Sequence, residues 1–119
     1  MTTMERYTNT SAMLLEQAEI ELEAGDLVQA SEKFWGAAAQ ALKATAQSRG
    51  WSHDSHAHFY HIIRKIIDET GDDELLDFFN AANLLHVNFY EGLLRLHEIR
   101  TMADRVRSLI RRLDGLNAT

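Results

Sequence analysis

At 119 residues the chain has the length of one domain, large enough to bury a hydrophobic core of its own. Apolar residues make up 45% of it and charged residues 25%, a balance that excludes an intrinsically disordered chain. The net charge of −6 disfavours non-specific coating of DNA, and the lack of cysteine excludes disulfides and thiolate metal sites. We expect one domain over residues 1–119, with a core of about 12–113.

The N-terminus has neither the basic start nor the apolar stretch of an export signal, and nowhere do about 18 apolar residues run together. We therefore expect a protein that does not span a membrane. Because the absence of cysteine agrees with a reducing compartment, the cytoplasm is the expected location.

Apolar residues recur at helical spacing in five segments that are separated mostly by glycines, which predicts five helices and no strand. Their expected bounds are Thr10 or Ser11 to Gly25, Asp26 to Arg49, Asp54 or Ser55 to Gly71, Asp72 or Asp73 to near Gly92, and Ile99 to Gly115. The chain has no proline, and its connections of two to six residues predict that sequential helices lie antiparallel. The predicted fold class is all-α, a compact antiparallel bundle of about five helices.

The second helix is expected to be central, because two apolar stripes run along it. One stripe consists of Leu27, Ala30, Phe34, Ala37 and Ala41, and the other of Trp35, Ala38, Leu42 and Ala46. The run from Gly36 to Ala39 lacks bulk, which would let a neighbouring backbone approach closely. At the start of this helix, Asp26 and Gln29 have the spacing of a capping box.

Charge is distributed unevenly along the chain. Residues 1–32 contain seven acidic residues and one basic residue, whereas residues 93–113 contain six arginines and two acidic residues. One interpretation is that the first and last helices lie near each other and offset their charges. The alternative is an arginine face that binds phosphate, with Arg100, Arg107 and Arg111 at helical spacing.

Four histidines lie within nine residues, between His53 and His61, and suggest zinc or nickel. Metal sites usually take ligands from separate elements, however, and no Glu-x-x-His pair occurs in the chain. We therefore expect no metal and no other cofactor, and interpret this cluster as a partly solvated loop and helix start. A metal-binding helical protein is the weaker alternative.

A second polar cluster, His86-Val-Asn-Phe-Tyr-Glu91, interrupts the apolar pattern at the end of the fourth helix. His86 and Tyr90 lie at the edge of the predicted buried stripe. They would form either a hydrogen-bonded margin of the core, or a dimer contact, or a polar cleft with Asn88 and Glu91.

Three segments carry a resemblance to a known family. They are Ala24 to Ala38, which follows the pattern GDxxQASEKxWGAAA from Gly25 on, Arg-Gly-Trp-Ser-His at 49–53, and Leu-His-Val-Asn-Phe-Tyr-Glu at 85–91. These segments resemble the PaREP-type branch of the HEPN superfamily over roughly residues 12–113. The resemblance implies an antiparallel bundle of four or five helices that is commonly homodimeric. It also implies a connection to RNA, through metal-independent endoribonucleases or through partners of nucleotidyltransferases in toxin–antitoxin pairs.

The ribonuclease signature of that superfamily is an arginine followed, after four to six residues, by a histidine. Arg49 and His56 match this spacing, but they lie between the second and third helices rather than beside a later one. No nucleophile elbow, P-loop or dinucleotide fingerprint occurs either. The sequence therefore favours a non-catalytic or degenerate HEPN-like module, with a metal-independent endoribonuclease as the alternative.

The predicted module is a homodimer that binds RNA, a nucleotide or a partner protein, such as a nucleotidyltransferase. The expected binding residues are His86, Asn88, Tyr90, Glu91, Arg100, Arg107 and Arg111. If the chain is a ribonuclease, Arg49 and His56, or His86 from each subunit, would be catalytic. The aromatic residues Trp35, Phe59 and Phe89 exceed what a short core needs, so we expect some of them in a two-fold interface.

Overall fold

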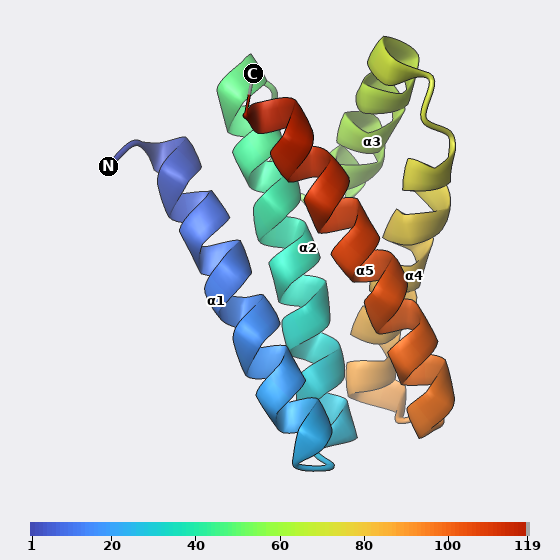
Figure 1. Ribbon diagram of the computed structural model, residues 1–119. Coiled ribbons are helices and arrows are strands. Elements are labelled where there is room, and N and C mark those ends of the chain that lie inside the picture. The colour runs from blue at the N-terminus through green and yellow to red at the C-terminus, as the bar shows by residue number, and fades with distance from the viewer. Residues whose placement is uncertain (119) are drawn as a thin grey trace.

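Five α-helices account for the fold of residues 1–118, the part of the chain that the computed structural model describes, and that part contains no strand. The helices are α1 (Thr3–Glu23), α2 (Leu27–Arg49), α3 (His56–Thr70), α4 (Glu74–Glu91) and α5 (Leu96–Asn117). Figure 1 shows α2 between α1 and α4, with α5 packed beside it. None of the five helices is long and apolar enough to cross a bilayer. The predicted all-α bundle is confirmed.

Helix α2 is the centre of the bundle, because it contacts each of the other four helices. Both predicted stripes are inside. The buried members are Ala30, Phe34, Ala37 and Ala41 from one stripe, and Trp35, Ala38, Leu42 and Ala46 from the other. A helix that is apolar on two sides is stable only when it is covered on both. The amino-acid pattern of α2 therefore determines the layout of the domain.

The turn between α1 and α2 is built from the residues that the sequence indicated. Gly25 has a φ of +82°, a conformation that other residues adopt at a cost. The carboxylate of Asp26 then accepts a hydrogen bond from the backbone N–H of Gln29 at 3.2 Å, which caps α2. This turn folds α1 back along α2.

Two helices start earlier than the apolar spacing predicts. The hydroxyl of Thr2 accepts from the backbone N–H of Glu5 at 3.1 Å, so α1 begins at Thr3 rather than at Thr10 or Ser11. Glu98 accepts from the backbone N–H of Arg95 at 2.8 Å, so α5 begins at Leu96 rather than Ile99. Helix α5 also continues through Gly115 to Asn117. Capping residues rather than core residues determine where these helices start. A capping residue adds nothing to the apolar periodicity from which the helices were predicted.

Two contacts fix the direction of α3. Near its start His56 stacks on Trp35 of α2, with ring centroids 5.0 Å apart, and near its end Glu69 pairs with Arg49 at 2.8 Å. Helix α3 therefore runs in the same direction as α2, as Figure 1 shows. The expectation that every connection joins antiparallel helices is wrong for this pair. The segment 50–55 returns along α2, since six residues in an extended path span about 20 Å.

At Gly36 the small residues of α2 leave room for a side chain of α1. A methyl group added at Gly36 would lie 3.2 Å from Cδ1 of Leu14, which belongs to α1. Leu14 therefore fills the space over Gly36. One residue further on, the Ser11 hydroxyl of α1 donates to the backbone oxygen of Ala37 at 2.7 Å, so the two helices approach closely here, as the sequence suggested.

Candidate binding site on the Trp35 indole

Three helices bring two imidazoles onto one indole ring. Trp35 of α2 is only 8% exposed, because it is covered by His56 of α3 at 5.0 Å and by His86 of α4 at 4.8 Å between ring centroids. The two imidazole centroids are 5.9 Å apart, less than the sum of their distances to the indole. The imidazoles therefore lie side by side over Trp35. We call Trp35, His56 and His86 the histidine platform.

Hydrogen bonds fix the orientation of both imidazoles. His86 Nδ1 donates to Glu32 Oε1 at 3.0 Å, and His56 Nε2 donates to Asn83 Oδ1 at 2.9 Å. The amide nitrogen of Asn83 donates in turn to the hydroxyl of Tyr60 at 3.2 Å. Within residues 1–118 the other ring nitrogens, Nε2 of His86 and Nδ1 of His56, have no hydrogen-bond partner. Each imidazole thus keeps one nitrogen for a ligand.

Each half of this arrangement follows from helical spacing. Glu32 and Trp35 are three residues apart on α2, as are Asn83 and His86 on α4, so each pair shares one face of its helix. The sequence interpretation singled out His56 and His86 as site residues, but it assigned Trp35 to a core stripe and an interface and did not consider Glu32 or Asn83 for the site. The spacing within each helix was the available signal, whereas the pairing between helices depends on the tertiary fold.

Aromatic core residues support the platform from below. The ring centroids of Phe59 and Phe79 lie 5.8 and 6.0 Å from that of Trp35, and Tyr60 contacts Phe79 edge-on at 4.8 Å. Trp35 and Phe59 are thus buried within their own chain. They are therefore not available to a subunit interface, and of the three aromatic residues of which some were expected there, Phe89 is the one left partly exposed.

The segment from His86 to Glu91 does not form one cleft, because its residues point to different sides of α4. Tyr90 is 70% exposed and meets His86 edge-on at 5.5 Å, so it borders the platform. Asn88 is 2% exposed and is used inside the protein: its amide donates to Ser31 Oγ at 3.0 Å and accepts from the N–H of Leu94 at 2.7 Å. Glu91 is exposed at the end of the helix.

Arg49 and His56, the pair with the ribonuclease spacing, lie at opposite ends of α3. The Arg49 guanidinium is bound to Glu69, and Glu69 follows His56 by thirteen residues along the helix. At 1.5 Å per residue this separates Arg49 from His56 by roughly 20 Å. Within one chain the structure therefore does not bring the two side chains together, and it joins His56 to His86 instead.

The pair of Arg49 and Glu69 leads to a pH prediction. Hydrogen bonding from Arg49 holds the pKa of the Glu69 carboxyl below its ordinary value of 4.5. A lowered folded-state pKa stabilises the protein above the unfolded-state value, and this contribution is lost as the pH falls through the folded-state pKa. Glu69→Gln should therefore be less stable than wild type at pH 7, and the difference should shrink as the pH falls below 4.5 and through the folded-state pKa. Urea unfolding at pH 7 and at a series of lower pH values measures this, and a pH-independent difference would contradict it.

The arginine row of α5 lies on another side of the bundle. Arg107 donates to Glu19 of α1 and to Asp104, both at 2.6 Å, and covers the ring of Phe34 at 5.5 Å. Phe34 lies two residues, or about 200° around α2, from the Glu32 that holds His86. The structure therefore does not join this row to the platform.

Each of the two interpretations of the charge gradient holds for some of the three arginines, and Arg107 follows the first. Its bond to Glu19 offsets charge between the first and last helices, as expected for neighbouring acidic and basic helices. Arg100 and Arg111 stay exposed, and Arg111 donates only to Ser108 of its own helix, at 3.1 Å. Two arginines thus remain accessible to a phosphate.

The four histidines between His53 and His61 face different partners. His53 lies 3.3 Å from the amide oxygen of Gln47, and His58 Nδ1 accepts from the backbone N–H groups of Asp54 and Ser55. His61 is exposed on α3. Among the described residues no group of three histidine or carboxylate side chains is placed to hold a metal ion.

Comparison with known proteins finds a similar fold and identifies the family. A crystal structure of a protein from Sulfolobus solfataricus is similar to this one, with a TM-score of 0.79 over 89% of this chain and 94% of that chain, at 23% sequence identity. No curated protein matches the sequence. The model of the archaeal PaREP1/PaREP8 family matches residues 6–110, which is most of the chain. The chain therefore belongs to the archaeal PaREP1/PaREP8 family.

Proposed function

We propose that this chain is a homodimeric, non-catalytic helical module of HEPN type that binds single-stranded RNA at the histidine platform. One observation carries the proposal: two imidazoles, each with an uncommitted ring nitrogen, lie side by side on a buried indole. Nothing in the hydrophobic core requires polar rings at this position. A surface built in this way combines flat aromatic faces with hydrogen-bond acceptors.

These groups match the chemistry of an unpaired nucleotide. Single-stranded RNA is bound mainly by stacking of bases on aromatic side chains and by contacts to phosphate. Tyr90 offers an exposed ring at the rim, and the imidazoles of His56 and His86 offer acceptor nitrogens to the donor groups of base edges. Arg100 and Arg111 add an attraction for the backbone from a separate face. Arg107 contributes least, since Glu19 and Asp104 already neutralise it.

A second function is favoured by the contact between His86 and Glu32. A carboxylate bound to Nδ1 orients an imidazole so that Nε2 can exchange a proton with a substrate, and a second imidazole beside it supplies the opposite role. On this reading the chain is a metal-independent endoribonuclease, with His56 and His86 as acid and base. Arg49 takes no part, because it lies at the far end of α3.

Binding of a fluorescein-labelled single-stranded RNA, followed by anisotropy, tests the proposal. His56→Ala, His86→Ala and Tyr90→Ala should each weaken binding by about 1–3 kcal/mol, roughly 5- to 150-fold, since each removes a ring that contacts a base or phosphate. His61→Ala is the matched control, because His61 is an exposed histidine of α3 outside the platform. Replacing Arg100 and Arg111 by glutamine should reduce the slope of log affinity against log salt by about 1.4.

The same RNA, incubated with protein and EDTA and resolved on a gel, separates the two functions. We expect the RNA to stay intact. Cleavage by wild type that is lost in His56→Ala and His86→Ala, but kept in His61→Ala, would establish the ribonuclease instead. Binding that is absent, or equal in wild type and all platform variants, would overturn the RNA proposal and leave a partner protein as the ligand.

A further inference from the structure

The Arg-Gly-Trp-Ser-His motif at 49–53 is not part of the histidine platform. It follows α2, where Gly50 has a φ of +71° and the N–H of Trp51 donates to the carbonyl of Ala46 at 2.9 Å. The indole of Trp51 is half-buried and contacts α3, because the Lys65 ammonium lies 5.0 Å from its ring centroid. The motif thus places an aromatic wall beside α3.

A cavity of ≈ 340 Å³ lies between this motif and α3. Pockets that bind small molecules usually measure about 300–1,000 Å³, so its size suits a small ligand. Trp51 and Ser52 line the cavity on one side, and the side chains that line it from α3 are His58, His61, Ile62, Arg64, Lys65 and Asp68. We call it the α3 cavity. Since only Trp51 and Ile62 are apolar, a ligand would be held here mainly by polar groups.

Aromatic rings, rather than acids, hold the two cations of the α3 cavity. Lys65 lies over Trp51, and the Arg64 guanidinium lies 5.8 Å from the ring centroid of Tyr60. Asp68 is three residues from Lys65 and four from Arg64, but within residues 1–118 it forms an ion pair with neither. A contact with an aromatic face fixes a cation and leaves its N–H groups uncommitted.

The cations that link helices are held by carboxylates instead. These pairs are Lys33 with Glu21, Arg107 with Glu19, and Arg112 with Asp72. Arg49, at the edge of the α3 cavity, likewise pairs with Glu69, so the carboxylate of Glu69 is neutralised there. Arg64 and Lys65 therefore outweigh Asp68, and the α3 cavity has a net positive charge.

Neutral donors complete the lining of the α3 cavity. His58 Nδ1 accepts from the backbone N–H groups of Asp54 and Ser55 at 3.1 and 3.3 Å, so the proton of the neutral ring lies on Nε2. In the described part of the chain, Nε2 of His58, the hydroxyl of Ser52 and the ring of His61 have no hydrogen-bond partner. Two cations and several donors without an acceptor thus line one cavity.

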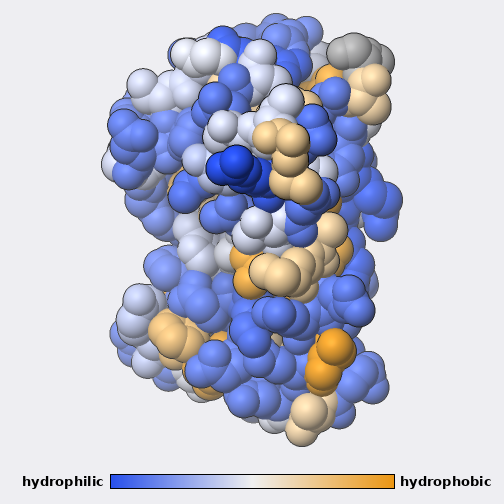
Figure 2. Space-filling view, turned by 90° about the vertical axis from the view of Figure 1, so that its left-hand side faces the viewer, coloured by the Kyte–Doolittle hydropathy of each residue, from blue (hydrophilic) through white to orange (hydrophobic). Residues whose placement is uncertain are grey.

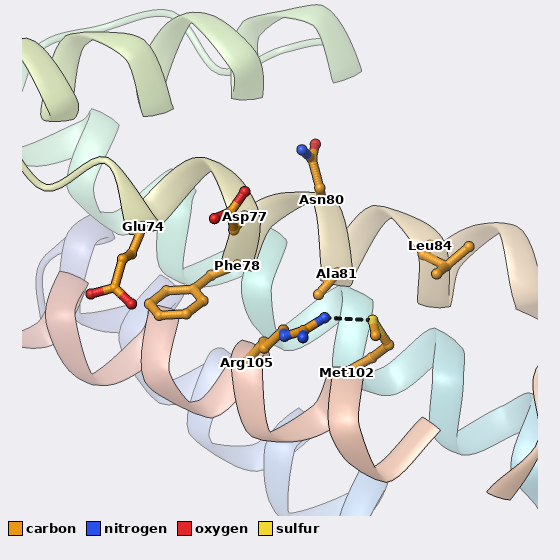
Figure 3. A pocket seen from close by; sticks show the side chains of 8 residues that line it. All are labelled: Glu74, Asp77, Phe78, Asn80, Ala81, Leu84, Met102 and Arg105. Atoms are coloured by element: carbon orange, nitrogen blue, oxygen red, sulfur yellow. Dashed lines mark hydrogen bonds between the residues drawn. The ribbon is translucent and has the colours of Figure 1, made fainter. Parts of the chain in front are cut away.

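Other surfaces do not offer this chemistry to an anion. Figure 3 shows a larger groove, of ≈ 570 Å³, which Glu74 and Asp77 line together with one cation, Arg105, whose guanidinium donates to the sulfur of Met102 at 3.8 Å. Figure 2 shows that the α1 side is largely hydrophilic, but α1 contains five glutamates and one arginine. Acids outnumber bases at both places, in contrast to the α3 cavity.

We propose that the α3 cavity binds a phosphate monoester, the group that a phosphorylated small molecule shares with an RNA carrying a 5′-phosphate. Such a group has three acceptor oxygens and a charge of about −1.5 to −2 at pH 7, which match the two cations and the donors around them. Lys65 contributes most, because Trp51 holds its ammonium at the wall of the cavity. The remaining acceptor, Asp68, suits a hydroxyl on the alcohol part of the ester.

This site is separate from the histidine platform. His58 follows His56 by two residues, or about 200° around α3, so the two histidines lie on different sides of the helix. His56 contacts Trp35 of α2 and Asn83 of α4, whereas His58 lines the α3 cavity. The inference therefore does not depend on RNA binding at the platform.

Calorimetric titration with glycerol 3-phosphate tests the site with a free phosphate monoester. We expect saturable binding of one molecule per chain, and no binding of glycerol, which lacks the phosphate. Lys65→Gln should weaken binding about 10-fold or more, because it removes a charge-assisted hydrogen bond. Lys43→Gln, which changes a lysine of α2 that does not line the cavity, is the matched control and should bind as wild type does. Circular dichroism checks that both variants keep their helices.

Two RNAs that differ only in a 5′-phosphate or a 5′-hydroxyl, both labelled with fluorescein at the 3′ end, identify the source of the phosphate. If it is the end of an RNA, the 5′-phosphate should strengthen binding about 10-fold or more, and Lys65→Gln should remove that gain. Equal affinity of the two RNAs, together with binding of glycerol 3-phosphate, would assign the cavity to a free phosphorylated molecule. The platform is tested on the 5′-hydroxyl RNA, so His61→Ala remains its control.

Failure of this inference can be told apart from failure of the RNA proposal. Binding of the 5′-hydroxyl RNA should be the same in Lys65→Gln as in Lys43→Gln, because Lys65 lies outside the platform. If glycerol 3-phosphate does not bind and the 5′-phosphate adds nothing to RNA affinity, the phosphate site is overturned and the platform is untouched. Phosphate-dependent binding that Lys65→Gln leaves unchanged would equally remove the α3 cavity as its site.

Discussion

Replacing Phe79 by alanine is expected to lower the free energy of unfolding by about 3–5 kcal/mol. The ring of Phe79 is completely buried, and it contacts Trp35, Phe59 and Tyr60. Alanine would leave a cavity beneath the histidine platform that these rings can close only in part. Thermal unfolding followed by circular dichroism should show a fall of about 10–20 °C in Tm, since 1 kcal/mol corresponds to about 4 °C in a domain of this size.

The volume-preserving change gives the control. Phe79→Leu keeps an apolar side chain in place, so its cost should stay near 1.5 kcal/mol, well below that of alanine. If alanine and leucine cost the same, the ring would not be the support that the structure shows. RNA binding by folded Phe79→Leu should stay close to wild type, because leucine still supports Trp35 from below.

The elements that the sequence predicted correctly are those whose signal is local. The two stripes of α2 are inside, and Asp26 caps the helix at the expected place, since a cap and an apolar period are both determined by residues within a few positions. The start of α1 was missed by seven or eight residues because Thr2 caps a turn that carries no apolar stripe. The direction of α3 was missed because loop length limits reach but does not determine direction.

The candidate site was predictable only in part, for a similar reason. His56 and His86 were both recognised as candidates, but on separate grounds, and no rule of spacing joins residues that are 30 positions apart. Trp35, which holds the two together, fits a core stripe equally well. A residue that belongs to both the hydrophobic core and a binding site shows only the apolar spacing of the core in the sequence. The structure is needed to recognise its second role.

The segment from Leu85 to Glu91 shows how one motif divides into three tasks. Leu85 is buried in the core, His86 and Tyr90 form the platform and its rim, and Asn88 joins α4 to its neighbours. The helical period explains the division, since each residue turns about 100° from the one before it. Substitutions within this segment should therefore separate stability from binding.

Asn88→Ala is expected to lower the free energy of unfolding by about 3 kcal/mol without altering the RNA-binding surface. The side chain of Asn88 accepts from the N–H of Leu94 at 2.7 Å and donates to Ser31 Oγ at 3.0 Å, which ties the turn after α4 to the second turn of α2. Alanine leaves the N–H of Leu94, a half-buried donor, without its acceptor and leaves a small cavity beside Ser31. A fall in Tm of about 10 °C should follow.

Asn80→Ala is the matched control for Asn88→Ala, because Asn80 belongs to the same helix but is exposed. Its effect should remain within about 0.5 kcal/mol. The two variants should also differ from His86→Ala, which removes a platform ring and should weaken RNA binding more than stability. If Asn88→Ala were as stable as Asn80→Ala, or if it lost RNA affinity while fully folded, Asn88 would be a ligand-binding residue, as the sequence first indicated, rather than an internal link between helices.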